Sequence, residues 1–298
     1  MQSKYRMRIS RKMTGFLLTL PALIVLGVTI LYPLLWALKI SFSSSNSVIK
    51  GTNEWVGLEN YIGVLGSKPF LDSLWNTSGF VGVTIVMELA IGLIIAVALN
   101  KRLPANGLFV VIFSLPLMMA PIVSGFIWRW LFADQYGIIN HFITLLGMDA
   151  PIWLSSPFWA KASVLISNLW GATPFVILVL YAGLTGISDD VNEAAEIDGA
   201  RGFRLFRYIT LPLLKPAILL VLVIRVADAF RMYDVVYILT GGGPGGATNV
   251  LNTFIYRRSF SDFQFGEGAA ASFIVLFIIV MVSLAIGRIL SSGRGEQK

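Results

Sequence analysis

The sequence contains no cysteine and a single histidine, His141, among its 298 residues. Without cysteine the chain can form no disulfide, no thiolate nucleophile and no zinc site built on cysteine ligands. One histidine also excludes a histidine-rich metal site. Thiol catalysis and histidine-based metal centres are therefore removed from the candidate functions.

Charge is scarce as well. Only 13% of the residues are charged and 56% are hydrophobic, whereas an ordinary soluble domain carries about 25% charged residues. The mean hydropathy is +0.77, so the usual polar surface is missing. This composition excludes a soluble globular enzyme and a disordered chain. It predicts one transmembrane domain over residues 1–298.

No G-x-x-x-x-G-K-[ST] motif occurs, so the chain has no phosphate-binding loop for ATP. The glycine-rich stretch Gly241–Gly246 has no following lysine, and its glycines and proline predict irregular backbone at the external mouth. An integral-membrane enzyme would also need catalytic groups, and the sequence shows no cluster of acids at a membrane face. We therefore expect that the chain is not an enzyme.

Six apolar segments are long enough to cross a bilayer, which takes roughly 20 residues as a helix. They predict an all-α, six-helix polytopic bundle. Pro116 and Pro121 are expected to kink the third segment. The predicted spans are 14–38, 74–99, 108–131, 162–187, 216–239 and 269–290.

The basic residues are distributed unevenly between the two sides of these spans. One side has 14 lysines and arginines, the other has six, and Arg129, Arg225 and Arg231 fall within spans. The positive-inside rule then predicts that both termini are cytoplasmic. The net charge of +7 is thus explained by topology, and nucleic-acid binding is not expected. The first apolar run is too long for a signal peptide and no small-residue cleavage site follows it, so we interpret it as an uncleaved span.

The cytoplasmic connection between the fourth and fifth spans, residues 188–216, predicts a helical hairpin. Its first helix starts near Ser188 or Asp189, where an acidic first turn suits the positive helix end. Gly199 and Gly202 permit a sharp break. A second short helix follows, with an apolar face formed by Phe203, Phe206, Tyr208 and Ile209. Pro212 and Pro216 are expected to end it. From the residues alone, these aromatic groups either cover the ends of the protein's own helices or contact a partner.

This connection resembles the Glu-Ala-Ala loop of ATP-binding-cassette importer permeases. The matching residues are Glu193, Ala194, Ala195, Asp198, Gly199, Ala200, Phe206, Ile209, Leu211, Pro212 and Pro216. The resemblance implies that residues 188–216 form a coupling loop, whose helix docks into a cleft on a cytoplasmic ATPase.

Other stretches resemble the carbohydrate branch of that family, the maltose and glycerol-3-phosphate type. They are Tyr32–Trp36, Val56–Tyr61 and Asp234–Gly245. The resemblance implies a bacterial inner-membrane permease subunit that forms half of a translocation pathway for a sugar-like hydroxylated solute. The implied partners are a second homologous permease, two ATPase subunits that hold the ATP and magnesium, an extracytoplasmic solute-binding protein and membrane lipid.

Ionisable side chains within spans are costly and usually functional. Glu88 has Arg129 or a partner chain as candidate partners. Arg225, Asp228, Arg231 and Asp234 recur every three residues, a spacing that brings each acid within reach of an arginine. These four form either a structural ladder of ion pairs or, at Arg225 and Asp228, hydrogen-bonding groups for a hydroxylated solute.

Two helix faces are the candidate walls of a substrate site, in the region that the resemblance to the maltose permease implies. Polar groups there would meet hydroxyls and aromatic groups would meet ring faces. The alternative is ordinary helix packing around small residues. The predicted substrate-pathway residues are Asn168, Gly171, Ala172 and Phe175 on the fourth span, and Arg225, Asp228, Ala229 and Met232 on the fifth.

An ion-coupled secondary transporter, driven through the buried charges, is the alternative function. It would work without an ATPase, and it leaves the cytoplasmic hairpin unexplained. Within the preferred class, oligosaccharides or glycosides, polyols and glycerol phosphate remain open as solutes.

Overall fold

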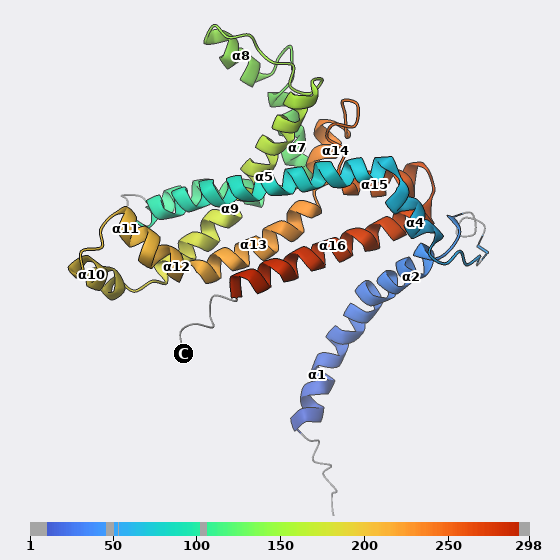
Figure 1. Ribbon diagram of the computed structural model, residues 1–298, viewed down its shortest axis with the longest axis horizontal. Coiled ribbons are helices and arrows are strands. Elements are labelled where there is room, and N and C mark those ends of the chain that lie inside the picture. The colour runs from blue at the N-terminus through green and yellow to red at the C-terminus, as the bar shows by residue number, and fades with distance from the viewer. Residues whose placement is uncertain (1–10, 46–50, 53, 102–105, 292–298) are drawn as a thin grey trace, which may run out of the picture. The chain divides into compact units, whose positions relative to one another are not determined.

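The computed structural model describes residues 11–45, 51–52, 54–101 and 106–291. These residues form helices joined by turns (Figure 1), and the strand pairing among them is one isolated bridge between Ser43 and Trp55. The prediction of an all-α chain is therefore confirmed. Several basic residues on which the topology depends lie outside the described residues: Lys4, Arg6, Arg8, Lys50, Arg102, Arg294 and Lys298.

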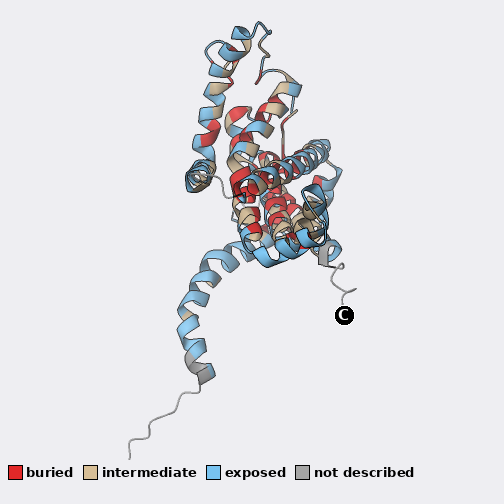
Figure 2. Cartoon of the chain, turned by 90° about the vertical axis from the view of Figure 1, so that its left-hand side faces the viewer, coloured by how far each residue is buried: buried red, intermediate tan, exposed pale blue. Residues whose placement is uncertain are grey.

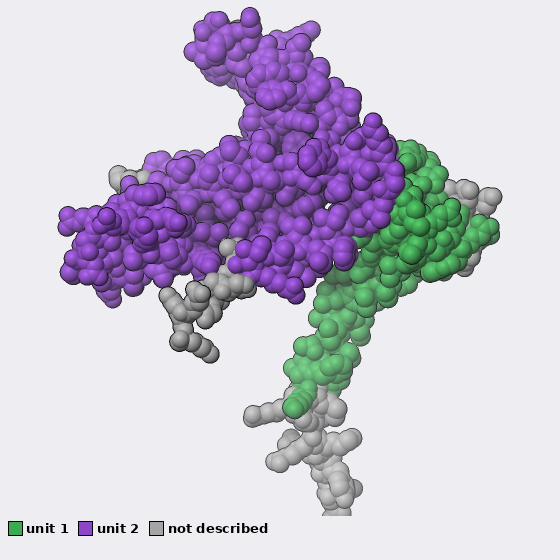
Figure 3. Space-filling model, viewed as in Figure 1, with its two compact units in different colours: residues 1–64, 258–273 green, residues 65–257, 274–298 purple. Residues whose placement is uncertain are grey.

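The chain divides into two compact units, which Figure 3 shows in different colours. Unit 1 comprises residues 1–64 and 258–273, and unit 2 comprises residues 65–257 and 274–298. The elements of unit 1 are α1 (Arg11–Leu26), the π-helical η1 (Gly27–Leu31), α2 (Tyr32–Ser41), most of α4 (Glu59–Gly66), most of the π-helical η4 (Arg257–Ser261) and the start of α16 (Phe265–Ser291).

In unit 1, α1, η1 and α2 form one apolar helical run, Gly15–Ser41, whose most apolar window has no buried residue. The buried residues of α2 are its last two, Ile40 and Ser41. Ser41 is held there because its hydroxyl lies 2.8 Å from the Tyr61 hydroxyl and Asn60 donates to its carbonyl oxygen.

Unit 2 is built around two long helices, α5 (Lys68–Leu99) and α9 (Pro157–Thr185). Each begins with a serine at the N-cap and a proline in the first turn, where the missing N–H is not needed. The other elements are α6 (Asn106–Ser114), η2 (Leu115–Met118), α7 (Pro121–Leu131), α8 (Ile138–Leu145), α10 (Asp189–Ile197), α11 (Phe203–Leu205), η3 (Phe206–Thr210), α12 (Leu211–Leu213), α13 (Lys215–Phe230), α14 (Asp234–Leu239), α15 (Leu251–Tyr256) and the rest of α16.

The long helices approach each other closely. A side-chain carbon at Gly92 of α5 would lie 2.6 Å from Val176 Cγ1 of α9, so only glycine fits there. Buried residues gather among these packed helices in Figure 2. One hydrophobic cluster surrounds Phe132, Trp153 and Val236, and a second surrounds Leu180, Leu214 and Val221.

Four described helices are long and apolar enough to cross a membrane, and the number is six if each of two bent pairs is one span. The first bent pair joins residues 106–118 to 121–131 at 98°. Pro116 and Pro121 flank this break, so the kink that they predicted is confirmed and is sharper than a bend within one helix. The second pair joins residues 203–213 to 215–230 at 63°.

The predicted end of the fifth span at Leu239 is wrong, because α13 ends at Phe230. The Asn252 side chain donates to the carbonyl oxygens of Phe230 and Met232 and thereby satisfies backbone acceptors at this helix end. Residues 234–239 form the separate helix α14, which packs against α7.

Candidate functional site

The coupling loop forms the predicted hairpin. Helix α10 starts after Ser188 and ends in a left-handed glycine, Gly199, with φ of +82°. Gly199 N–H donates to the Glu196 carbonyl, and Ala200 N–H donates to the Ala195 carbonyl. This pair of bonds is a Schellman motif, which requires a residue that adopts positive φ without strain. The glycine of the Glu-Ala-Ala motif is thus dictated by the way this helix ends.

A second glycine starts the other arm of the hairpin. Gly202 has φ of +56°, and its carbonyl accepts from Phe206 N–H at 3.1 Å as the helical turn begins. The helical run continues to Leu213 and bends at Leu214, just before Pro216 in the first turn of α13. The predicted break and the predicted end of the second arm are both confirmed.

The large apolar side chains of the coupling loop are exposed. Ile197 is 86% exposed, Phe203 79% and Tyr208 70%. Phe206 and Ile209 are half-buried, and Ala195 is buried. The chain's own helices therefore do not cover the most prominent aromatic groups of this loop.

The bend at Leu214 is fixed against α9. Leu214 is 1% exposed, and a side-chain carbon at Gly183 of α9 would lie 2.8 Å from Leu214 Cδ1 and 2.9 Å from Ala217 Cβ. The sequence analysis missed Gly183, since a lone glycine late in an apolar helix carries no distinguishing signal.

A buried ion pair joins α5 to α13. Arg225 Nε donates to Glu88 Oε2 at 2.8 Å, and Arg225 Nη2 donates to Glu88 Oε1 at 2.9 Å. This two-pronged arrangement is the strongest geometry for an arginine and a carboxylate. Glu88 is 1% exposed and Arg225 8%. Glu88 was predicted to pair with Arg129 or a partner chain; it pairs with Arg225, while Arg129 donates to the Ile238 carbonyl instead.

The third member of this group is Asp228. Arg225 Nη1 donates to Asp228 Oδ2 at 3.2 Å, and the Asp228 side chain is 49% exposed. The three side chains carry one positive and two negative charges. The group extends from the buried Glu88 to the accessible carboxylate of Asp228. The described residues contain no ion pair between Arg231 and Asp228 or Asp234, so the predicted ladder is reduced to the Arg225–Asp228 rung.

The other predicted pathway residues are placed differently on the two helices. On α9, Asn168, Gly171, Ala172 and Phe175 are half-buried. The Asn168 Oδ1 atom is buried and lacks a hydrogen-bond partner, as do the nearby hydroxyls of Ser167 and Thr173. On α13 and just beyond it, Ala229 and Met232 are buried, and Met232 belongs to the hydrophobic cluster of Phe132 and Trp153. No hydrogen bond among the described residues joins Asn168 to Arg225 or Asp228.

The glycine-rich stretch is irregular, as predicted, and is tied to α5. Gly241, Gly242, Gly245 and Gly246 have positive φ. Asn76 Nδ2 donates to the carbonyl oxygens of Gly246 and Asn249. This stretch thus lies at the beginning of α5. The coupling loop lies at the other end of α5 in Figure 1, where Asn106 donates to the Leu99 carbonyl and to the Tyr181 hydroxyl.

The chain is similar to known permeases over most of its length. It is 37% identical over 277 residues to a trehalose/maltose transport system permease protein of Thermococcus litoralis, covering 92% of this chain and 93% of the relative. It is 34% identical over 279 residues to a sulfoquinovosyl glycerol transport system permease protein of Agrobacterium fabrum, covering 92% and 89%.

A solved structure shares the fold. A chain of a bacterial alginate ABC transporter, crystallised with an alginate pentasaccharide-bound periplasmic protein, superimposes with a TM-score of 0.81 at 20% identity, covering 94% of this chain and 95% of that one. Residues 88–293 also match the family described as the inner membrane component of binding-protein-dependent transport systems. The chain belongs to this family and is a multi-pass permease subunit of an ATP-binding-cassette importer in the inner membrane.

Proposed function

We propose that this permease carries a sugar-type, hydroxyl-rich solute and is driven by two ATPase subunits that bind its coupling loop and that of a second, similar permease. An extracytoplasmic binding protein would deliver the solute at the end that holds Gly241–Gly246. The permease itself hydrolyses no ATP in this scheme. The carbohydrates in the names of its relatives support the solute class.

The proposed topology has six spans within a single permease domain over residues 1–298. They are the four long helices, the bent pair of residues 106–131 and α13, while residues 203–213 stay in the coupling loop. Both termini are then cytoplasmic. The positions of the coupling loop and of Gly241–Gly246 at opposite ends of α5 support this arrangement. The uneven distribution of basic residues supports the same orientation.

The exposure of Phe203 and Tyr208 on the coupling loop is the observation that carries the proposal. Large aromatic groups at the centre of an interface supply much of its binding energy. Exposed on an otherwise ordered hairpin, they suit a cleft on a partner protein better than contact with water. The proposed docking residues are Glu193, Ala194, Ala195, Asp198, Gly199, Ala200, Phe206, Ile209, Leu211 and Pro212.

The docking proposal is tested by Gly199→Leu and Phe206→Ala. We expect each variant to insert normally but to retain about tenfold less ATPase subunit on purification, and to lose solute-stimulated ATP hydrolysis. Phe142→Ala is the matched control, because Phe142 is 59% exposed on α8. Normal stimulated hydrolysis in both coupling-loop variants, at wild-type subunit ratios, would remove the docking claim.

The proposed solute pathway uses Asn168 and Asp228 as its polar groups, with Gly171, Ala172, Phe175, Arg225, Ala229 and Met232 around them. The unpartnered Asn168 oxygen can accept a hydrogen bond from a hydroxyl. The net negative charge of the Glu88–Arg225–Asp228 group favours neutral over anionic solutes. The names of the relatives do not decide the charge of the solute, because trehalose and maltose are neutral whereas sulfoquinovosyl glycerol carries an anionic sulfonate.

Uptake by Asn168→Ala and Asp228→Asn tests the pathway. Both changes spare the buried Glu88–Arg225 pair, so lost folding does not confound the result. We expect weaker solute affinity in each, and in Asp228→Asn a greater relative uptake of anionic solutes. Unchanged uptake and selectivity in both variants would show that these two helix faces do not line the solute pathway.

A further inference from the structure

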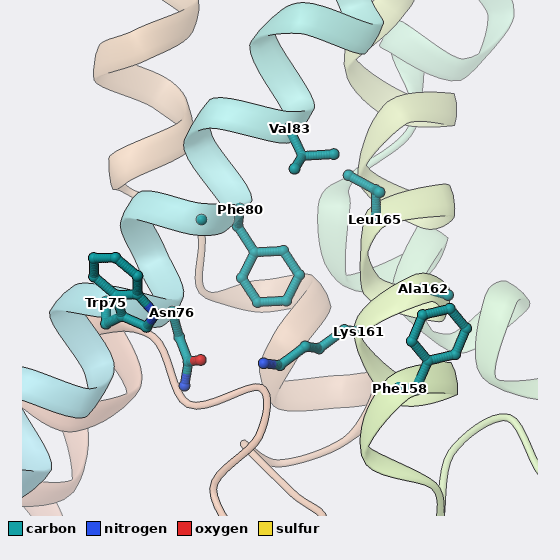
Figure 4. A pocket seen from close by; sticks show the side chains of 9 residues that line it. Trp75, Asn76, Phe80, Val83, Phe158, Lys161, Ala162 and Leu165 are labelled. Carbon is teal, nitrogen blue, oxygen red and sulfur yellow. The ribbon is translucent and has the colours of Figure 1, made fainter.

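A pocket of 360 Å³ lies between the early turns of α5 and α9. Figure 4 shows it with Trp75, Asn76 and Val83 on α5, and Phe158, Lys161 and Leu165 on α9. None of these residues belongs to the coupling loop or to the predicted solute pathway.

The polar groups of the pocket, Asn76 and Lys161, lie near one end of it (Figure 4). Lys161 extends from α9 toward α5, where Phe80 and Asn76 lie (Figure 4). No described residue forms an ion pair with Lys161. The Asn76 amide nitrogen already donates to two backbone carbonyls. The Lys161 ammonium is therefore the main polar group available to a ligand.

The other end of the pocket, at Val83 and Leu165, is apolar (Figure 4). Val83 lies eight residues, about 12 Å, along α5 from Trp75, and Leu165 lies about 6 Å along α9 from Lys161. The pocket thus changes from a cationic group at Lys161 to apolar side chains at Val83 and Leu165. A molecule with an anionic head and a hydrocarbon tail matches both ends. A hydroxylated solute would leave most of this wall without a matching group.

The position of the pocket also favours lipid. It lies early in two candidate spans, Lys68–Leu99 and Pro157–Thr185. Tryptophan and lysine are characteristic of this level, where the hydrocarbon meets the headgroups. Trp75 is 82% exposed and Phe158 71%, so both rings can line the path of an acyl chain.

We propose that this pocket binds one anionic phospholipid, with its phosphate at Lys161 and one acyl chain along Val83 and Leu165. The site depends only on insertion in the membrane, and it is independent of the solute and of the ATPase partner.

Two glycines of α5 give a matched pair of variants. Gly79 lines the pocket, and a Cβ there meets no atom within 4 Å, so Gly79→Leu has open space for its first side-chain carbon and is expected to occupy the pocket. Gly82 is equally open but does not line the pocket. Gly82→Leu therefore controls for the added side chain and for the gain in helix propensity.

The test measures quenching of tryptophan fluorescence in the purified transporter by phosphatidylglycerol with brominated chains. We expect saturable quenching, with about fivefold weaker binding of brominated phosphatidylcholine, since one lysine near an anionic headgroup has an effect of that size. Lys161→Gln should abolish this preference, and Lys161→Arg should keep it. Gly79→Leu should lose the saturable component, and Gly82→Leu should retain it.

Five results would overturn the proposal. Equal binding of the two lipids by the wild-type protein would indicate ordinary boundary lipid. Retained saturable quenching in Gly79→Leu, or equal loss in Gly82→Leu, would separate the lipid from this pocket. Competition by trehalose would assign the pocket to solute, and competition by inorganic phosphate at the same concentration as lipid would assign it to a free anion.

Discussion

Charged side chains are usually exposed and large apolar side chains are usually buried. The Glu88–Arg225–Asp228 group departs from the first of these rules, and the coupling loop departs from the second. In the first, two charged groups are buried and satisfied within the chain. In the second, large apolar groups such as Phe203 are exposed on a polar helical hairpin. The comparison separates a feature that the chain completes by itself from one that the proposed docking of an ATPase would complete. Stability should therefore respond to changes at the first and assembly to changes at the second.

The largest expected effect is that of Glu88→Leu. It leaves the Arg225 guanidinium buried without its carboxylate, at a cost of about 3–5 kcal/mol. We expect thermal unfolding of the purified transporter at a much lower temperature, or loss of the chain from the membrane. Glu196→Gln, an exposed acid of the coupling loop, should leave the unfolding temperature unchanged.

The double variant Glu88→Leu/Arg225→Leu sharpens this prediction. Removing both charges should restore most of the stability, because no unpaired buried charge remains. If the single variant were as stable as the wild type, Asp228 alone would be a sufficient partner for Arg225, and the Glu88–Arg225 ion pair would not organise this unit.

A smaller effect is expected at the junction of the two regions. Gly183→Val places a side chain against Leu214 and Ala217, where a first carbon already falls below 3.0 Å. Overpacking of this kind costs about 1–3 kcal/mol. Gly171→Val is the control for thermal unfolding, since the same helix has open space there. Adding Ala217→Gly to Gly183→Val should recover part of the loss; no recovery would place the strain elsewhere.

The smallest effect on the chain alone is expected for Phe203→Ala. Its ring is 79% exposed, so the free energy of unfolding of the isolated permease should change by no more than about 0.5 kcal/mol. ATPase binding should nevertheless fall. Leu214→Ala is the contrasting variant, because this buried leucine should cost about 2–5 kcal/mol. Similar destabilisation by both changes would contradict the distinction between the exposed and the buried apolar side chains of the coupling loop.

The coupling loop was predictable because its signals are local. Ser188 at a helix start and Gly199 and Gly202 at a reversal act within a few residues of each other, and the structure confirms all three. The pairing of Glu88 was not predictable in the same way. The location of Glu88 within a predicted span indicates that this acid needs a partner. However, 137 positions separate Glu88 from Arg225 in the sequence. Only the packing of α5 on α13 selects that arginine over Arg129.

The prediction that the fifth span ends at Leu239 was wrong for a related reason. Hydrophobicity continues through residues 231–239, so the pattern favours one helix, whereas the chain stops at Phe230 and turns. The stop depends on Asn252, which reaches back across 22 positions to the Phe230 carbonyl. A local sequence pattern cannot predict a capping side chain that is so distant in the sequence. The position of Asn168 on its helix was predictable from the local pattern, whereas Met232, predicted on the helix of the fifth span, lies beyond the end of α13. Their roles in the solute pathway stay predictions that transport assays can test.

The bend at Leu214 has a mechanical consequence. The arms on either side of it are partly exposed, but Leu214 itself is enclosed and lies close to Gly183 of α9. A close-packed contact has little free volume in which to absorb a displacement. A torque applied to the coupling loop would therefore be delivered to α9 and α13 together at this one point. A short movement of the coupling loop can then turn both helices that carry the proposed solute pathway.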